Sequence, residues 1–227
     1  MDVELEDSVA RIFLNRPEKA NALNSAMLSA LADALGSLER ETLRVVVIAG
    51  RGRNFCGGAD SAELKALIPA NAGAFVEKIH QVCAKIRGLP VPVVARLHGA
   101  VIGAGLEIAA ACDLRVAAEG TKFSMPEVRL GIPSVVEAAL LPRLMGSGRA
   151  AWLVLTGEAI DARRALEWGL VEEIGDGENL LEKLRSNDRH ALRMQKQLLQ
   201  LWDEAPLATS IAASIERFAH SYRGKRT

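Results

Sequence analysis

The sequence is poor in cysteine, histidine and aromatic residues. Its 227 residues include three cysteines, four histidines, one tyrosine and 4% aromatic residues overall. Cys56, Cys83 and Cys112 stand far apart, and no Cys-x-x-Cys pair occurs. This pattern argues against a disulfide framework and against a zinc site. We therefore expect reduced thiols, as in proteins of a reducing compartment, and no metal centre.

Excess charge and long apolar segments are also missing. Lys and Arg number 28, and so do Asp and Glu, so net charge indicates no nucleic-acid or acidic-membrane partner. The apolar segment 100–112 is interrupted by Gly103, Gly105 and Glu107 and falls short of the roughly 18 residues that a membrane span needs. Residues 1–7 are acidic and lack the apolar stretch of a signal peptide. The sequence therefore predicts a cytoplasmic protein that binds no membrane.

Segments typical of strands alternate with segments typical of helices as far as residue 174. Apolar, β-branched runs predict strands at 9–14, 43–49, 91–97, 114–117, 121–123 and 170–174. Helical spacing and capping residues predict helices after Asn24 and at 61–67, 72–87, 103–111, 134–145, 149–155 and 162–168. This alternation indicates right-handed crossovers and a mostly parallel sheet, hence an α/β fold. We divide the chain into a core, 1–174, and a helical C-terminal region, 175–227, with a helix break at Pro206.

The first candidate for chemistry is the loop 54–60, Asn-Phe-Cys-Gly-Gly-Ala-Asp. Two glycines after a strand permit backbone geometries that aim N–H groups into a pocket. A helix that begins near Asp60 favours negative charge at its start. A plain tight turn with a helix cap accounts for the same residues, because such glycine turns are common.

The second candidate is the segment 99–107, Gly-Ala-Val-Ile-Gly-Ala-Gly-Leu-Glu. Glycines in the first turn of a helix cost about 1 kcal/mol each relative to alanine, so we expect a ligand or another backbone to lie close. Glu107 follows Ala104 by three residues, on the same helix face. A carboxylate in this apolar setting needs partners or a raised pKa. Neighbouring N–H groups that satisfy Glu107 remain the alternative to a catalytic role.

Two more carboxylates follow. Glu127, in Met125-Pro126-Glu127, would fit general acid–base chemistry on water if it met Glu107, although spacing alone does not bring the two together. Ser134-x-x-Glu137 matches a helix capping box, which we favour over a third active-site carboxylate at Glu137. The glycine segments match neither a P-loop nor a dinucleotide fingerprint, and no nucleophile elbow is present.

Taken together, these segments resemble the crotonase (enoyl-CoA hydratase/isomerase) superfamily. The likeness runs from residue 9 to about 175 and consists of ordered motifs. These are the opening loop 15–24 over CoA, the two oxyanion-hole motifs 55–60 and 98–113, the Pro-Glu segment 123–131 and a later signature in 155–171. The resemblance implies a spiral of β-β-α units and a C-terminal helical region that mediates trimers, often paired into hexamers.

The resemblance also implies roles for individual residues. The backbone N–H groups of Ala59 and Ala104 would form an oxyanion hole for the thioester oxygen. Glu107 and Glu127 match the two carboxylates of hydratases, which activate water and deliver a proton in the reversible hydration of a trans-2-enoyl-CoA. The residues that would line the CoA and acyl part of the site are Lys19, Ala20, Ala22, Gly58, Ala59, Asp60, Ala62, Gly103, Ala104 and Val135. No cofactor is implied beyond the CoA of the substrate.

The sequence departs from the family pattern after the Pro-Glu segment. Val135 and Val136 stand where hydratases carry flexible, glycine-rich sequence, and they would narrow the acyl pocket. Ala104 replaces a glycine, and the C-terminal region looks short. Alternatives therefore stay open: an enoyl-CoA isomerase, a dehydratase of a specialised, carnitinyl-type thioester, a non-catalytic acyl-CoA-binding protein and, less favoured, a CoA-ester hydrolase.

Overall fold

A computed structural model describes residues 1–38 and 42–222, so the end of the predicted region 175–227 lies outside the described residues. The chain forms a six-stranded sheet of order β1-β2-β3-β4-β6-β9 and a three-stranded sheet of order β5-β7-β8. The strands are β1 (Asp2–Glu6), β2 (Val9–Leu14), β3 (Val45–Gly50), β4 (Val93–Leu97), β5 (Ala100–Ile102), β6 (Leu114–Ala117), β7 (Lys122–Ser124), β8 (Ile160–Asp161) and β9 (Glu173–Ile174).

The six-stranded sheet is parallel from β2 to β9, and β1 is added antiparallel at its edge. The predicted mostly parallel sheet is therefore confirmed. Both of its faces are buried. Val46 and Ile48 of β3 belong to the main core, whereas Val45 and Val47 pack with Leu181 of helix α8 (Glu178–Ser186). Burial on both faces explains why β3 reads as an unbroken β-branched run.

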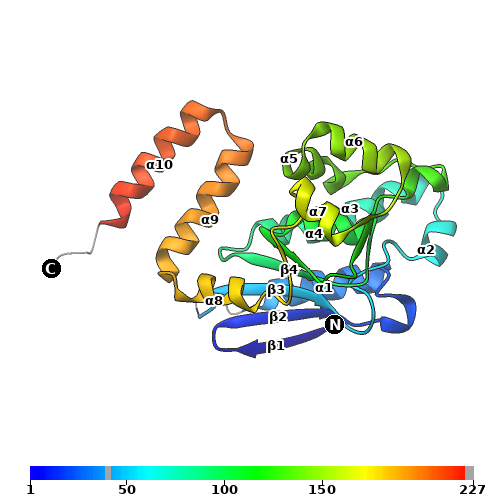
Figure 1. The fold of residues 1–227 in the computed structure, drawn as a ribbon, viewed down its shortest axis with the longest axis horizontal. Helices are drawn as coiled ribbons and strands as arrows, with labels where there is room; N and C mark the ends of the chain where they lie inside the picture. Colours follow the sequence, from blue (N-terminus) through cyan, green and yellow to red (C-terminus); the bar gives the residue numbers. More distant parts are fainter. Residues whose placement is uncertain (39–41, 223–227) are drawn as a thin grey trace.

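Helices cover the sheets and extend beyond them (Figure 1). They are α1 (Ser25–Ser37), α2 (Ser61–Lys65), α3 (Pro69–Arg87), α4 (Ala104–Ala111), α5 (Leu141–Met145), α6 (Ser147–Thr156), α7 (Ala162–Trp168), α8 (Glu178–Ser186), α9 (Arg189–Glu204) and α10 (Leu207–Ser221), with 3-10 turns η1 (Pro17–Lys19), η2 (Glu127–Leu130) and η3 (Val136–Leu140). The break at Pro206 is confirmed, since α9 ends and α10 begins around it. These two helices run side by side and extend away from the sheets. No helix in the described ranges is long and apolar enough to cross a bilayer.

Three strands, β1, β5 and β8, were not predicted from the sequence. β1 forms a hairpin with β2 through Asp7 and Ser8, which both have positive φ, but its acidic residues do not suggest a strand. β5 has only three residues between two glycines, and β8 has two. The predicted strand 170–174 pairs only at its end, as β9. Strands this short carry too little periodicity to be detected in the sequence.

The single helix predicted for 134–145 is wrong. The segment forms η3 followed by the short α5. Pro142 has no N–H and cannot continue a helical hydrogen-bond ladder from the preceding turn. Val136 has φ 40, a conformation that is a true outlier for a β-branched residue. The capping box is wrong as well, because the N-cap of η3 is Val135 and it makes no side-chain cap.

Candidate active site

The loop 54–60 and β5 form the frame of the site. The Cys56 N–H donates to Ala100 O at 3.0 Å, and the Ile102 N–H donates to Cys56 O at 3.0 Å. These bonds fix the loop along β5, directly before α4. The two glycine-containing segments predicted from the sequence therefore lie against each other.

Two glycines permit this close approach. A Cβ on Gly105 would lie 2.6 Å from Cys56 Cβ, so any side chain there would push α4 away from the loop. Gly103, the N-cap of α4, has φ 52, and a Cβ on it would collide with the carboxylate of Glu127. The first turn of α4 is therefore packed against the loop on one side and against Glu127 on the other.

The two N–H groups predicted to form an oxyanion hole have no acceptor among the described residues, and the same holds for the N–H of Gly105 in the first turn of α4. The two predicted groups belong to Ala59, just before the N-cap of α2, and to Ala104, the first residue of α4. Within 1–38 and 42–222, neither donates to a backbone or side-chain oxygen. Each follows a glycine with positive φ, Gly58 and Gly103. Unpaired N–H groups beside a buried helix start favour a negatively charged oxygen.

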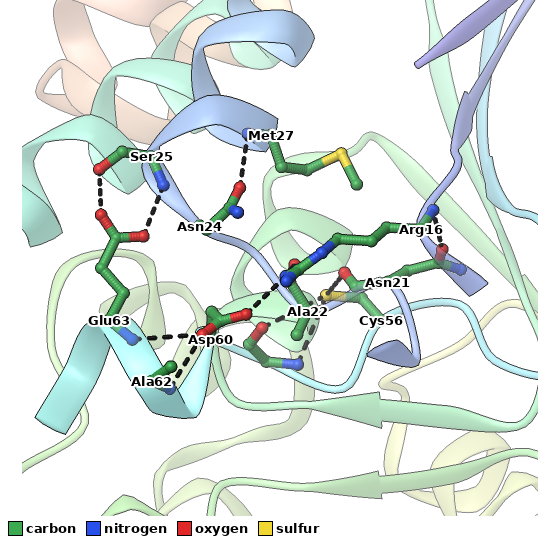
Figure 2. A network of polar contacts seen from close by, with 11 residues as sticks. Arg16, Asn21, Ala22, Asn24, Ser25, Met27, Cys56, Asp60, Ala62 and Glu63 are labelled. Carbon is green, nitrogen blue, oxygen red and sulfur yellow. Dashed lines mark hydrogen bonds and ion pairs between the residues drawn. The ribbon is translucent and has the colours of Figure 1, made fainter. Parts of the chain in front are cut away.

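Asp60 fastens this region to the opening loop, as Figure 2 shows. Its carboxylate accepts from Arg16 Nη1 at 2.5 Å and from the N–H groups of Ala62 and Glu63 at the start of α2. The Arg16 guanidinium, with these N–H groups, lowers the pKa of Asp60. The Asp60 N–H donates in turn to Leu23 O at 2.8 Å. Asp60 is thus a cap and a tether rather than a group free for chemistry.

The remaining residues predicted to line the CoA site also gather here. Ala20 adopts a left-handed conformation, and its carbonyl accepts from the Gly57 N–H at 2.8 Å. The Ala22 carbonyl accepts from Arg16. Lys19 is exposed at the end of η1.

The role of Asn21 was not predicted from the sequence. It is fully buried, its amide donates to Arg51 O and Asn54 O, and its Oδ1 accepts from the Arg16 N–H. Asn21 thereby ties the opening loop to the start of the loop 54–60. Asparagine is so common in loops that no local signal marks this role.

Asp60→Ala removes both the cap and the tether. We expect a loss of about 1 kcal/mol in the free energy of unfolding, the usual cost of deleting an N-cap, together with weaker binding of acyl-CoA. Urea unfolding followed by circular dichroism measures the first effect, and titration with a thioester measures the second. Asp161→Ala, which deletes a comparable cap at α7, should reduce stability without affecting thioester binding. Equal loss of binding in both variants would contradict the tether role.

The two carboxylates predicted to be catalytic are Glu107, which is part of α4, and Glu127, which lies against the N-cap of α4. Glu107 on α4 is only 5% exposed, and its Oε1 accepts from the Ala138 N–H at 3.3 Å. Glu127, half-buried in η2, lies against Gly103 and accepts from Ser134 Oγ at 3.0 Å. Burial first, then the charge of Glu127, raises the pKa of Glu107 to about 8; Glu137 adds to the effect and the Ala138 N–H opposes it. The negative charge of Glu127 thus disfavours ionisation of Glu107.

The segment 134–138 supplies partners to both carboxylates. Ser134 reaches Glu127, and Ala138 reaches Glu107. Val135, predicted to line the acyl pocket, lies between these contacts and is 39% exposed. The capping-box spacing predicted a helix cap at Ser134, so the contact of Ser134 with Glu127 was not predicted.

The raised pKa of Glu107 makes stability depend on pH. The unfolded chain loses this proton near the ordinary glutamate pKa, whereas the folded chain keeps it until about pH 8, so the free energy of unfolding falls as pH rises between these values. Glu107→Gln removes that loss. We expect the variant to be more stable than the wild type at pH 9, by up to about 5 kcal/mol at 1.4 kcal/mol per pKa unit, and similar to it at pH 4. Thermal unfolding at both pH values measures the difference. A gain that does not change with pH would contradict the raised pKa.

Comparison with known proteins identifies the family of the chain. A model described as enoyl-CoA hydratase/isomerase matches residues 4–221. The chain belongs to the enoyl-CoA hydratase/isomerase family. It is 32% identical over 230 residues to a short-chain-enoyl-CoA hydratase of Clostridium acetobutylicum, covering 97% of this chain and 88% of that protein. It is 35% identical over 192 residues to a 1,2-epoxyphenylacetyl-CoA isomerase of Escherichia coli, covering 82% and 73%.

A solved structure confirms the crotonase-type fold that the resemblance implied. The crystal structure of enoyl-CoA hydratase from Thermoplasma volcanium superposes with a TM-score of 0.94 at 32% identity, covering 99% of this chain and 92% of that one. The protein is thus a crotonase-family enzyme of the hydratase or isomerase kind, and an acyl-CoA thioester fits as its substrate class. Across the described ranges, no group of three or more His, Cys, Asp or Glu side chains could hold a metal ion.

Proposed function

We propose that this enzyme is an enoyl-CoA hydratase that adds water reversibly to a trans-2-enoyl-CoA. One observation carries the proposal: the Glu127 carboxylate lies against Gly103 at the start of α4, the helix that carries Glu107, and burial and the charge of Glu127 raise the pKa of Glu107 to about 8. Hydration needs hydrogen-bond donors and acid–base groups together, because it generates negative charge on the thioester oxygen and moves two protons. The chemistry requires no cofactor beyond the CoA of the substrate, and a cytoplasmic location remains the prediction of the sequence.

The thioester oxygen would accept from the N–H groups of Ala59 and Ala104. Water would attack C3 while Glu127 takes one of its protons, and the electron pair of the C2–C3 bond would pass to the oxygen as an enolate. Glu107, protonated at neutral pH, would then return a proton to C2. Donors aimed at developing charge are usually the largest catalytic contribution, about 3 kcal/mol for one donor.

Crotonyl-CoA tests this proposal directly. Hydration destroys the conjugated enoyl thioester, so its absorbance falls and the mass of the product rises by that of one water. We expect loss of absorbance with the wild type and with the surface control Glu119→Gln, whose side chain pairs only with the exposed Arg163 among described residues. A protein that binds crotonyl-CoA but leaves its absorbance and mass unchanged would contradict the proposal.

Double-bond isomerisation is the second candidate. It is favoured by the raised pKa of Glu107, since a protonated Glu107 leaves Glu127 as the base, and a single carboxylate can move a proton between two carbons. It would convert a 3-enoyl-CoA into the conjugated 2-enoyl-CoA, with a gain of absorbance. Glu107→Gln separates the two functions. It should nearly abolish hydration and spare isomerisation.

We further propose that the enzyme assembles as a homotrimer, or as a pair of trimers, through α9 and α10. Exposed apolar side chains line a groove on these helices; they are Trp202, Leu207, Ile211, Ile215 and Phe218. A contiguous exposed apolar patch marks an interaction surface. We expect Ile211→Asp with Ile215→Asp to yield monomers in analytical ultracentrifugation. A wild type that already sediments as a monomer would contradict the assembly.

A further inference from the structure

The turn that carries Glu127 has no buried side chain to hold it. η2 consists of four residues, none of which is buried, and its N-cap, Pro126, makes no side-chain cap. Its apolar residues, Val128 and Leu130, are exposed. A single 3-10 turn has poor hydrogen-bond geometry of its own. The position of Glu127 therefore depends on contacts between η2 and other elements.

Arg129 connects η2 to the C-terminal end of α6. Its Nε donates to Thr156 O at 3.1 Å, and its Nη2 donates to the Glu158 carboxylate. Thr156 is the last residue of α6, and η2 packs against this helix. The last carbonyl groups of a helix lack partners within the helix and favour a cation. The guanidinium thus satisfies a helix-end carbonyl and anchors η2 at the same time.

Gly157 lets the Arg129 side chain lie close across the end of α6. It is the C-cap of α6 and has φ 62. A Cβ on it would lie 3.0 Å from Arg129 Nε and 3.2 Å from Arg129 Cγ. The Pro-Glu segment 123–131 and the later signature 155–171 therefore meet at this side chain. The proposed hydration leaves the later signature without a role.

We propose that Arg129 is a positioning residue for hydration, because it fixes the backbone of η2 and thereby the place of Glu127. The Glu127 carboxylate lies against Gly103 at the start of α4, so a shift of η2 moves it relative to that helix. Ser134 orients the carboxylate itself, whereas Arg129 holds the turn that carries it. This inference rests on the proposed function for the use of Glu127, but the anchor can be measured without substrate.

Arg129→Gln tests the effect on the reaction, since glutamine lacks the charge and the paired donors of the guanidinium. We expect kcat for crotonyl-CoA hydration to fall by about 10-fold or more, because a small misplacement of a reacting group is costly, with little change in KM. Exposed ion pairs such as Arg129–Glu158 contribute little stability, so the variant should fold. Arg163→Gln, which removes an exposed arginine paired with Glu119, should keep the wild-type kcat. An unchanged kcat in Arg129→Gln would overturn the proposal.

Hydrogen exchange at C2 of butyryl-CoA separates positioning of Glu127 from a general loss of structure. In the proposed mechanism, the C2 proton is moved by Glu107 and the enolate is stabilised with the help of Ala104. Both residues belong to α4, whereas the side-chain hydrogen bonds of Arg129 among described residues go to Thr156 and Glu158. Arg129→Gln should therefore keep the wild-type exchange while it loses hydration. Equal loss of both would contradict a role through Glu127.

Amide hydrogen exchange measures the anchor directly. The N–H groups of Gly131 and Ile132 donate to Val128 O and Glu127 O and close the turn. In Arg129→Gln, NMR should show faster exchange at Gly131 and Ile132, because the turn opens more often. Arg163→Gln should exchange like the wild type. Unchanged exchange in Arg129→Gln would show that Arg129 does not hold η2.

The two proposals can fail separately. Faster amide exchange in Arg129→Gln of a protein that does not hydrate crotonyl-CoA would uphold the anchor and remove the hydratase. Hydration with the wild-type kcat in Arg129→Gln would remove the positioning role and keep the hydratase.

Discussion

Glu127→Gln is expected to lower kcat for crotonyl-CoA hydration by about 10²–10⁴-fold, the usual contribution of a positioned acid or base. The amide cannot accept a proton from water, yet it has the same size and its oxygen can still accept from Ser134 Oγ. Stopped-flow measurement of enoyl absorbance gives the rate, and the thermal midpoint should stay close to that of the wild type. A folded variant that retains most of the wild-type rate would remove Glu127 from the mechanism.

Ala104→Pro is expected to lower kcat by about 10²–10³-fold, as loss of one oxyanion donor does. A backbone N–H cannot be deleted by an ordinary side-chain change, but proline has none. Ala104 is the first residue of α4, the helix position that proline tolerates best. The variant should therefore fold and still bind CoA, while it stabilises the enolate poorly.

Ser147→Pro is the matched control for this variant. Ser147 is the first residue of α6 and also follows a positive-φ glycine, Gly146, but it is exposed and lies on a different helix from the candidate site. It should keep wild-type kcat. If both proline variants lose activity equally, the effect of Ala104→Pro is structural. The result would then give no evidence for an oxyanion hole.

The features of the fold that extend over many residues could be predicted from the sequence. The buried run of β3 and the helical spacing of α1 and α3 each contain enough periodicity to be recognised. The short strands β5 and β8 could not be found this way, although β5 is what aligns the loop 54–60 with α4. These strands are stabilised by pairing with segments distant in the sequence, and a local sequence pattern does not reveal such pairing.

Part of the candidate site could be predicted from the positions of glycines and of a carboxylate in an apolar segment. Gly103 and Gly105 pointed to close approach, and the structure shows Glu127 beside one and Cys56 beside the other. Glu107 stood out as a carboxylate in an apolar helix, and its pKa is raised. Roles for Ala59 and Ala104 came from the resemblance and stay predictions.

Side-chain partnerships across the fold were not predictable. Ser134 and Glu137 have the spacing of a capping box, yet Ser134 donates to Glu127 and Glu137 lies against His80. Only the packing of η3 against α3 and α4 decides this outcome. Local propensity is overridden here by tertiary contacts, as is expected at a functional site.

Hydrogen exchange at C2 of butyryl-CoA in deuterated water tests the central claim most directly. This saturated thioester cannot be hydrated or isomerised, so exchange reports only that Ala59 and Ala104 stabilise an enolate while a carboxylate moves the C2 proton. We predict deuterium at C2 with the wild type, followed by mass spectrometry, and almost none with Ala104→Pro. Tight binding of butyryl-CoA to the wild type without any exchange at C2 would contradict the account.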